Sequence, residues 1–167
     1  MSYRVESLAE GHDLDSFDCG EPALNAWLTQ HARATGQGTR TYVLIDEGTA
    51  EVIGYFALAP HIVERVQAPR SVSRGAPQRI PAILLAKLAL DRKLHGQGLG
   101  AELLVHALRT IIPAARLAGG RVVVVDAANG AAASFYRAHD FQPSPTDPNR
   151  LIMKLSTAAR ALGLEWP

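Results

Sequence analysis

Three observations predict a single domain of the α/β (α+β) class, built on a mixed sheet. Strand-like and helix-like segments alternate along most of the chain. Two strand-like runs, at 82–91 and 121–127, are apolar almost throughout, which is typical of strands buried within a sheet. The 167 residues show no internal repeat and suffice for one hydrophobic core. We therefore expect residues 1–167 to form one domain.

The first half of the chain is expected to contribute three strands and a helix. Residues 3–8 form a first strand, and a helix begins near Pro22, a residue suited to the first helical turn. Segments 39–46 and 51–66 flank a turn and should pair as a hairpin. Residues 67–80 are rich in proline, glycine, serine and arginine without an apolar period, which indicates a surface loop.

The second half is expected to follow a β-α-β-α-β order. After the buried strand 82–91 and a glycine-rich stretch, apolar residues recur every three or four positions and predict a helix with a broad buried face. Pro113 and the pair Gly119 and Gly120 close this helix. The remaining elements are a strand at 121–127, a short helix at 129–141, a last strand at 148–155 and a helical turn or two in the tail.

The composition is that of an ordinary globular protein, with 47% hydrophobic and 20% charged residues. No apolar run approaches the roughly 20 residues that span a bilayer, and the polar, acidic start is unlike a signal peptide. The single cysteine, Cys19, cannot form an intramolecular disulfide, and no cysteine or histidine cluster has zinc-ligand spacing. We expect a cytoplasmic protein with no membrane contact and no metal.

The stretch 95–100, which reads HGQGLG, stands between the buried strand and the long helix. The first N–H groups of a helix lack partners and carry partial positive charge, and glycines let a phosphate approach them. No Gly-Lys-Ser/Thr follows, which excludes a Walker loop, and the spacing and late position argue against a Rossmann fingerprint. A plain glycine-rich turn is the structural alternative to a phosphate site.

HGQGLG, placed after a strand ending LALD and before a helix, resembles motif A of the GNAT N-acetyltransferases. Gly98 and Gly100 match the glycines of that motif, and His95 stands where the family prefers arginine or glutamine. The later SFYRAHDF resembles motif B of the family, with Asp140 in place of the usual glycine. The resemblance implies a GNAT fold, whose mixed, mostly antiparallel central sheet is splayed at the acetyl-CoA site and flanked by helices.

Three further segments resemble a subfamily, the GNAT toxins of type II toxin–antitoxin pairs. They are FDCGEPALNAWL near the start, GYFALAP in the hairpin and IPAILLAKLALD in the central strand. This resemblance implies transfer of an acetyl group from acetyl-CoA to the α-amino group of an aminoacyl-tRNA, which blocks translation. It also implies a ribbon-helix-helix antitoxin as a partner and, because such toxins commonly dimerise, a homodimer.

The same resemblance assigns residues to an acetyl-CoA site. Backbone N–H groups of the glycine loop would hold the pyrophosphate, and the strand before it would pair with the pantetheine arm and supply an oxyanion donor. Asn129 would also face that arm. The cofactor-binding residues are therefore Leu88, Ala89, Leu90, His95, Gly96, Gln97, Gly98, Leu99, Gly100, Ala101 and Asn129.

Tyr136, in the second motif, is the expected catalytic residue. A phenol with a pKa of about 10 stays protonated at pH 7 and can protonate the thiolate, of pKa about 8.5, that leaves a tetrahedral intermediate. The alternative role is that of a core aromatic beside Phe135. Two adjacent aromatics on a helix cannot both point inward well, and the motif match favours catalysis.

No general base stands out in the sequence. Glu64, His61 and Asp91 are nominal candidates, each better explained as structural or solvent-facing. At pH 7 an α-amine with a pKa of about 7.7 is roughly one-sixth unprotonated, whereas a lysine amine is only about 0.04% unprotonated. A chain without a strong base is therefore expected to acetylate an α-amine, such as that of aminoacyl-tRNA or a protein N-terminus.

Basic residues are concentrated in one part of the chain. Residues 65–93 carry seven lysines and arginines against one acid, whereas residues 1–64 carry three arginines against ten acids. This segment favours a local anionic partner, with a solvated basic loop as the alternative. Arg92 and Lys93 could instead contact the phosphates of CoA, including its 3′-phosphate. The candidates for tRNA contact are Arg65, Arg70, Arg74, Arg79, Lys87, Arg92 and Lys93.

Two other functions stay open at this point. One is a GNAT acetyltransferase that modifies a small-molecule amine or a protein N-terminus. The other is a regulatory module that binds acyl-CoA without turnover, against which the intact Tyr136 and glycine loop argue.

Overall fold

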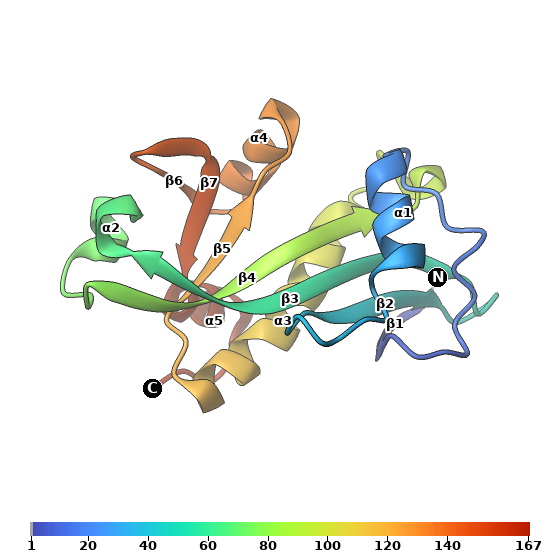
Figure 1. The fold of residues 1–167 in the computed structure, drawn as a ribbon, viewed down its shortest axis with the longest axis horizontal. Coiled ribbons are helices and arrows are strands. Elements are labelled where there is room, and N and C mark those ends of the chain that lie inside the picture. The colour runs from blue at the N-terminus through green and yellow to red at the C-terminus, as the bar shows by residue number, and fades with distance from the viewer. Residues whose placement is uncertain (1) are drawn as a thin grey trace. The chain divides into compact units, whose positions relative to one another are not determined.

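The computed structural model describes residues 2–167, in which seven strands and five α-helices form (Figure 1). The strands are hydrogen-bonded in the order β1-β2-β3-β4-β5-β7-β6. β4 and β5 are parallel, whereas the pairs β1–β2, β2–β3, β5–β7 and β6–β7 are antiparallel. This confirms the predicted mixed, mostly antiparallel α/β sheet.

The chain divides into two compact units, and β3, β4 and α3 contribute to both. The first unit takes in the chain up to Ala59 together with Ala86–Ala107. The second unit takes in Pro60–Leu85 and Leu108–Pro167.

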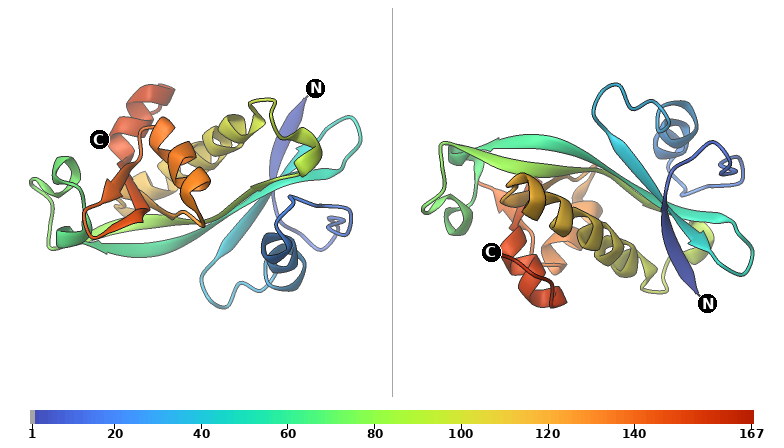
Figure 2. Two further views of the ribbon diagram at one scale, coloured as in Figure 1. Left: turned by 90° about the horizontal axis from the view of Figure 1, so that it is seen from above. Right: turned by 90° about the horizontal axis from the view of Figure 1, so that it is seen from below.

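The first unit is built on three antiparallel strands, with a helix on one face of them (Figure 2). The helix buries Leu28 completely, and Trp27 stacks on the ring of Tyr55 with 5.9 Å between ring centroids. The hydroxyl of Tyr55 donates to the carbonyl of Leu24 at 2.8 Å, which ties the helix to the sheet. The elements of this unit are β1 (Tyr3–Ser7), α1 (Pro22–Gln30), β2 (Arg40–Asp46), the first part of β3 (Val52–Glu64), the last part of β4 (Arg79–Leu90), the 3₁₀ helix η2 (Arg92–Leu94) and the start of α3 (Leu99–Ala118).

The second unit has β5 at its centre, parallel to β4 on one side and antiparallel to β7 on the other. Val123 and Val124 of β5 and Leu151 and Ile152 of β7 are fully buried, as their apolar runs predict. Its elements are the end of β3, the 3₁₀ helix η1 (Arg65–Gln67), α2 (Arg70–Ser73), the start of β4, the end of α3, β5 (Val122–Asp126), α4 (Gly130–Ala138), β6 (Gln142–Ser144), β7 (Asp147–Lys154) and α5 (Leu155–Leu162).

The predicted end of the long helix at Pro113 is wrong, because α3 continues through this proline to Ala118. Pro113 is exposed, whereas Ile112 and Ala115 are buried. The hydrogen bond that proline interrupts thus falls on the solvent-facing side, while burial of the opposite side keeps the helix intact. The helix ends at the predicted glycine pair, where Gly119 adopts a φ of +88°.

Two other boundaries also differ from the predictions. Segment 67–80 is not a simple loop, because it contains α2, whose Val72 is buried in the second unit, and the start of β4. α4 ends at Ala138, three residues before the predicted 141, because Asp140 adopts a φ of +71° and turns the chain. Aspartate tolerates this left-handed conformation, which explains how it replaces the glycine of motif B. The short β6 that follows was not predicted.

Candidate active site

The end of β4 provides a stretch of backbone outside the β4–β5 ladder. The last register pair between these strands joins Leu85 to Val125, and β4 continues five residues further, to Leu90. The predicted pantetheine-binding residues Leu88, Ala89 and Leu90 all lie in this extension. Their position fits the expectation that this backbone pairs with an extended ligand rather than with β5.

Asp91, directly after β4, is a structural residue of the first unit. Its side chain is 4% exposed and accepts hydrogen bonds from the N–H groups of Lys93 at 3.1 Å and Asp18 at 3.2 Å. The N–H of Asp91 itself donates to the carbonyl of Ile53 at 2.8 Å. Because each carboxylate oxygen accepts from a backbone N–H, these contacts favour a structural role for Asp91 over that of a general base.

The FDCG segment near the start of the chain is hydrogen-bonded to the residues that follow β4. The carboxylate of Asp18 accepts from the side-chain amide of Asn25 and from the N–H of Gly20, each at 2.9 Å, and both hydrogen bonds lower the pKa of Asp18. The carbonyl of Asp18 accepts from the N–H of Arg92 at 2.8 Å. The spacing of aspartate, glycine and asparagine in this motif therefore fixes the 3₁₀ helix that leads into the glycine loop.

The glycine loop has the backbone of an anion site. Gly96 and Gly98 adopt φ values of +77° and +78°, which favour glycine, and no atom lies within 4 Å of a Cβ placed on either residue. Residues 95–98 are exposed, and α3 begins at Leu99. The first N–H groups of this 20-residue helix therefore face an open space, with the positive end of the helix dipole behind them.

The side chains around this loop are largely engaged with other parts of the protein. The Nε2–H of His95 donates to the carbonyl of Leu90 at 2.8 Å, so the imidazole holds the loop to the end of β4. Arg92 pairs with Asp18 at 3.2 Å, and Lys93 pairs with Glu51 at 3.0 Å. The hydrogen bond that the Lys93 ammonium donates to Glu51 raises the pKa of Lys93. Backbone N–H groups are thus the main hydrogen-bond donors that the loop offers to an anion.

Tyr136 lies on α4 in the second unit, and 9% of its surface is exposed. Its ring is edge-on to Phe135 and to Phe141, with 5.3 Å between centroids in both pairs. Burial raises the pKa of Tyr136 to about 12. Its hydroxyl makes no hydrogen bond within residues 2–167, where the only fully buried side-chain polar atom without a partner belongs to Thr41. The phenol is therefore protonated, unpaired and accessible, as a proton donor must be.

Asn129 acts first as a helix cap. Its side-chain oxygen accepts from the N–H of Ala132 at 2.9 Å, and its backbone is extended. An asparagine in this position stabilises the first turn of α4, which in turn positions Tyr136. The predicted contact between Asn129 and pantetheine stays a prediction.

The two other nominal bases also have structural partners. The Nη1 group of Arg150 donates to Nε2 of His61 at 3.3 Å, so this nitrogen accepts a hydrogen bond instead of a substrate proton. Burial, and then the charge of Arg150, lower the pKa of His61. Glu64 pairs with Arg79 at 3.6 Å on the surface. The expectation that none of the three acts as a strong base is consistent with these contacts.

Sequence reasoning missed the ion pair that holds His61 in place. Arg150 contacts Asp126 in a bidentate manner, at 2.7 and 2.8 Å, across the antiparallel register of β5 and β7. The hydrogen bonds of this pair lower the pKa of Asp126 and raise that of Arg150. The three residues are far apart in the sequence, and no local motif signals their contact.

The structure separates the seven predicted tRNA-contact residues into two groups. Most are engaged: Arg65 donates to the carbonyl of Ala76 at 3.1 Å, Arg79 pairs with Glu64, Lys87 lies 5.5 Å from the centroid of Trp27, and Arg92 and Lys93 have the partners described above. By contrast, Arg70 and Arg74, both exposed at α2, have no side-chain partner among residues 2–167. These two arginines are free to bind an external anion.

Comparison with known proteins shows the family to which this chain is similar. Residues 37–143 match the model of the acetyltransferase (GNAT) domain. Over 158 residues the chain is 38% identical to a tRNA-acetylating toxin of Mycobacterium tuberculosis, which covers 93% of this chain and 94% of the relative.

Two solved structures add detail. AtaT complexed with acetyl-methionyl-tRNAfMet superposes with a TM-score of 0.87 at 32% identity, covering 96% of this chain and 99% of the other. A tyrosine-to-phenylalanine variant of AtaT, bound to the C-terminus of the antitoxin AtaR and to acetyl-CoA, superposes with a TM-score of 0.80 at 30% identity, covering 98% and 99%.

Proposed function

Because this chain belongs to the GNAT acetyltransferase family and stands close to its tRNA-acetylating toxins, we infer that it transfers an acetyl group from acetyl-CoA to aminoacyl-tRNA and so blocks translation. The observation that carries this inference is the 38% identity to a tRNA-acetylating toxin across 93% of the chain. The resemblance drawn from the two GNAT motifs is thereby confirmed.

We propose that acetyl-CoA is held mainly by backbone groups. The N–H groups at residues 97–101, where α3 begins, would bind its pyrophosphate, and the extension of β4 at Leu88–Leu90 would bind the pantetheine arm. The positive φ of Gly96 and Gly98, with open space where a side chain would stand, supports this assignment. We also propose that residues 1–167 act as a single acetyltransferase domain.

Transfer of the acetyl group then requires one nucleophile and one proton donor. The unprotonated α-amine attacks the thioester carbonyl, a C–N bond forms, and the C–S bond breaks as the tetrahedral intermediate collapses. The phenol of Tyr136 donates its proton to the leaving sulfur, while the amine releases a proton to water. Tyr136 is then reprotonated from solvent. Its raised pKa of about 12 keeps the donor protonated throughout the physiological range.

None of the three candidate bases is free, and this favours an α-amine as the acceptor. His61, Glu64 and Asp91 are all engaged elsewhere, so a substantial fraction of the amine must be unprotonated in solution. An α-amine meets this requirement and a lysine side chain does not. Arg70 and Arg74 supply unpaired positive charge for the phosphates of the acceptor.

The relatives also suggest partners. AtaT has been solved bound to the C-terminus of the antitoxin AtaR, and we propose that an antitoxin likewise binds this chain and thereby neutralises it. A ribbon-helix-helix fold for that antitoxin and a toxin homodimer stay predictions. None of the helices within residues 2–167 has the length and apolar character needed to cross a bilayer. The proposed substrate places the protein in the cytoplasm.

The test is acetylation of a mixture of charged tRNAs by the purified chain and acetyl-CoA, read by mass analysis of the 3′ aminoacyl group. We expect a gain of one acetyl group on the α-amine with the wild-type protein, and the same product formed about 10²- to 10⁴-fold more slowly with Tyr136→Phe. A free polyamine and a peptide N-terminus serve as competing acceptors in the same assay. Acetylation of either competitor with unmodified aminoacyl-tRNA would refute the proposal, and so would the absence of any turnover.

A further inference from the structure

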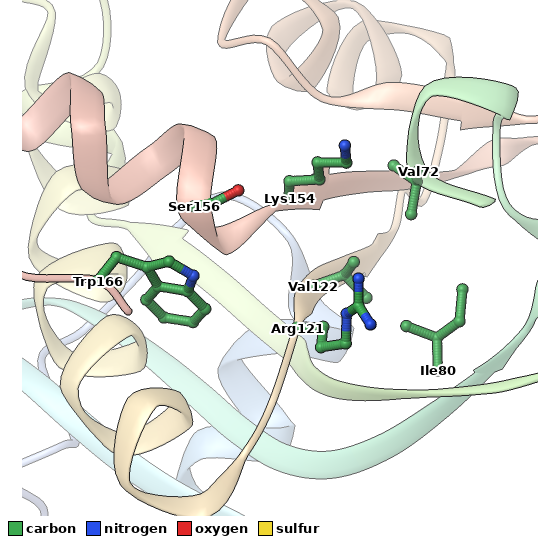
Figure 3. Close-up of a pocket in the computed structure, with 7 residues that line it drawn as sticks. All are labelled: Val72, Ile80, Arg121, Val122, Lys154, Ser156 and Trp166. Carbon is green, nitrogen blue, oxygen red and sulfur yellow. The ribbon is translucent and has the colours of Figure 1, made fainter. Parts of the chain in front are cut away.

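A pocket in the second unit gathers hydrogen-bond donors that have no partner (Figure 3). Arg121, Lys154, Ser156 and Trp166 line it, and none of their side chains makes a hydrogen bond or ion pair within residues 2–167. No aspartate or glutamate lines this pocket. Two cations, a hydroxyl and an indole N–H around one hollow, with no carboxylate among the lining residues, fit an anionic ligand group.

The backbone fixes these donors in place. The N–H of Arg121 donates to the carbonyl of Pro81 at 2.9 Å, and its carbonyl accepts from the N–H of Leu155 at 3.0 Å. Lys154 is the register partner of Val122 at the end of β7, and Ser156 lies in the first turn of α5. The ends of these strands and of α5 therefore place the Cα atoms of the three residues around the same pocket.

Size and lining narrow the class of ligand. The hollow measures about 130 Å³, well above the roughly 10–15 Å³ that a single water requires, and has room for a phosphate-sized group. Val72, Ile80 and Val122 form an apolar part of its wall. Glu165 is the acid next to Trp166 in the chain, and it pairs with Arg116 at 2.8 Å, so it does not neutralise the pocket.

The unit that holds the pocket also carries unpaired positive charge on α2. Val72, which lines the pocket, lies on α2 between Arg70 and Arg74, the two free arginines of the basic segment. Together with Arg121 and Lys154 they make four cations without a carboxylate partner among residues 2–167. Several unpaired cations in one region favour a polyanion, whose phosphates can occupy them in turn, over a single small anion.

We propose that this pocket is a second contact site for RNA, in which Arg121, Lys154 and Ser156 bind a backbone phosphate of the tRNA substrate beside the indole of Trp166. The assignment rests on the proposed function. It adds two cations, Arg121 and Lys154, that lie outside the basic segment 65–93 and were not predicted from the sequence. It also implies that the tRNA contacts residues of the second unit other than those assigned to acetyl-CoA binding and catalysis.

The test measures tRNA binding by fluorescence anisotropy without acetyl-CoA, over about 50 to 200 mM salt. The double variant Arg121→Gln, Lys154→Gln is compared with wild type and with Arg160→Gln, which removes an exposed cation from the same unit outside the pocket. If the two cations bind phosphate, the slope of log K against log salt decreases in magnitude by about 1.4 to 1.8. Acetyl-CoA affinity and the thermal unfolding midpoint stay at the wild-type values.

Other outcomes overturn the assignment. A double variant with the same slope as Arg160→Gln would show that the pocket does not bind RNA. Loss of binding to inorganic phosphate or AMP with an unchanged tRNA slope would assign the pocket to a small free anion instead. A defect in antitoxin binding alone would assign it to an acidic peptide. If wild type binds tRNA with the pocket-dependent slope but acetylates no aminoacyl-tRNA, the proposed function fails while the phosphate site stands.

Discussion

Replacement of Tyr136 by phenylalanine should separate catalysis from stability. The substitution removes one oxygen from a ring that packs edge-on against Phe135 and Phe141. Since the hydroxyl makes no hydrogen bond within residues 2–167, the ring packing survives and no partner is left unsatisfied. We expect the free energy of unfolding to change by no more than about 0.5 kcal/mol.

The effect on the reaction should be far larger. Loss of a general acid typically reduces the rate by about 10²- to 10⁴-fold. This corresponds to about 2.7 to 5.4 kcal/mol in activation free energy. The dissociation constant for acetyl-CoA should not change, because we propose that backbone groups of the glycine loop, and not the Tyr136 hydroxyl, hold the donor.

The assay combines single-turnover acetylation of aminoacyl-tRNA with thermal unfolding and acetyl-CoA titration. Tyr42→Phe is the matched control, because it removes the hydroxyl of a half-buried tyrosine that stacks on Phe56 in the first unit. The control should retain the wild-type rate. A Tyr136→Phe rate within about threefold of wild type would refute the assigned role, and an equal loss of rate and stability would show that Tyr136 is only a packing residue.

Three further predictions follow from particular contacts. Because burial raises the pKa of Tyr136 to about 12, the phenol stays protonated as the pH rises through 10, so the single-turnover rate at pH 10 should match the plateau; a fall to half, as for an ordinary tyrosine, would contradict the assignment. Gly120→Ala places a Cβ 3.0 Å from the Cβ of Ala115, and chemical denaturation should show a loss of about 1 to 3 kcal/mol in stability, with Gly119 left unchanged. The double variant Arg70→Gln, Arg74→Gln should weaken tRNA binding and its salt dependence without altering the KM for acetyl-CoA; equal tRNA affinity would exclude these arginines from the interface.

The sequence predicted the elements of the fold because their signals are local. The glycines before α3, the apolar period of that helix and the aromatic pair on α4 are each read within a few residues, and both GNAT motifs lie on the elements expected. The incorrect predictions concern single element boundaries, where burial decides the outcome. Pro113 was read as a helix end because the sequence does not show that Ile112 and Ala115 are buried on the opposite side.

The tertiary structure decided which charged groups are free to act. From the sequence alone, each of the seven cations of 65–93 is a candidate for contact with tRNA. Arg92 is occupied by Asp18 and Lys93 by Glu51, partners 74 and 42 positions away, whereas Arg70 and Arg74 are left unpaired. Arg121 and Lys154 gather at one pocket only because β5 and β7 pair in register. Whether a charged side chain is free to bind a ligand depends on contacts between distant segments, which form only when the chain folds. The glycine loop, the apolar period of α3 and the tyrosine motif of α4 are defined by neighbouring residues, so they can be recognised in the sequence itself.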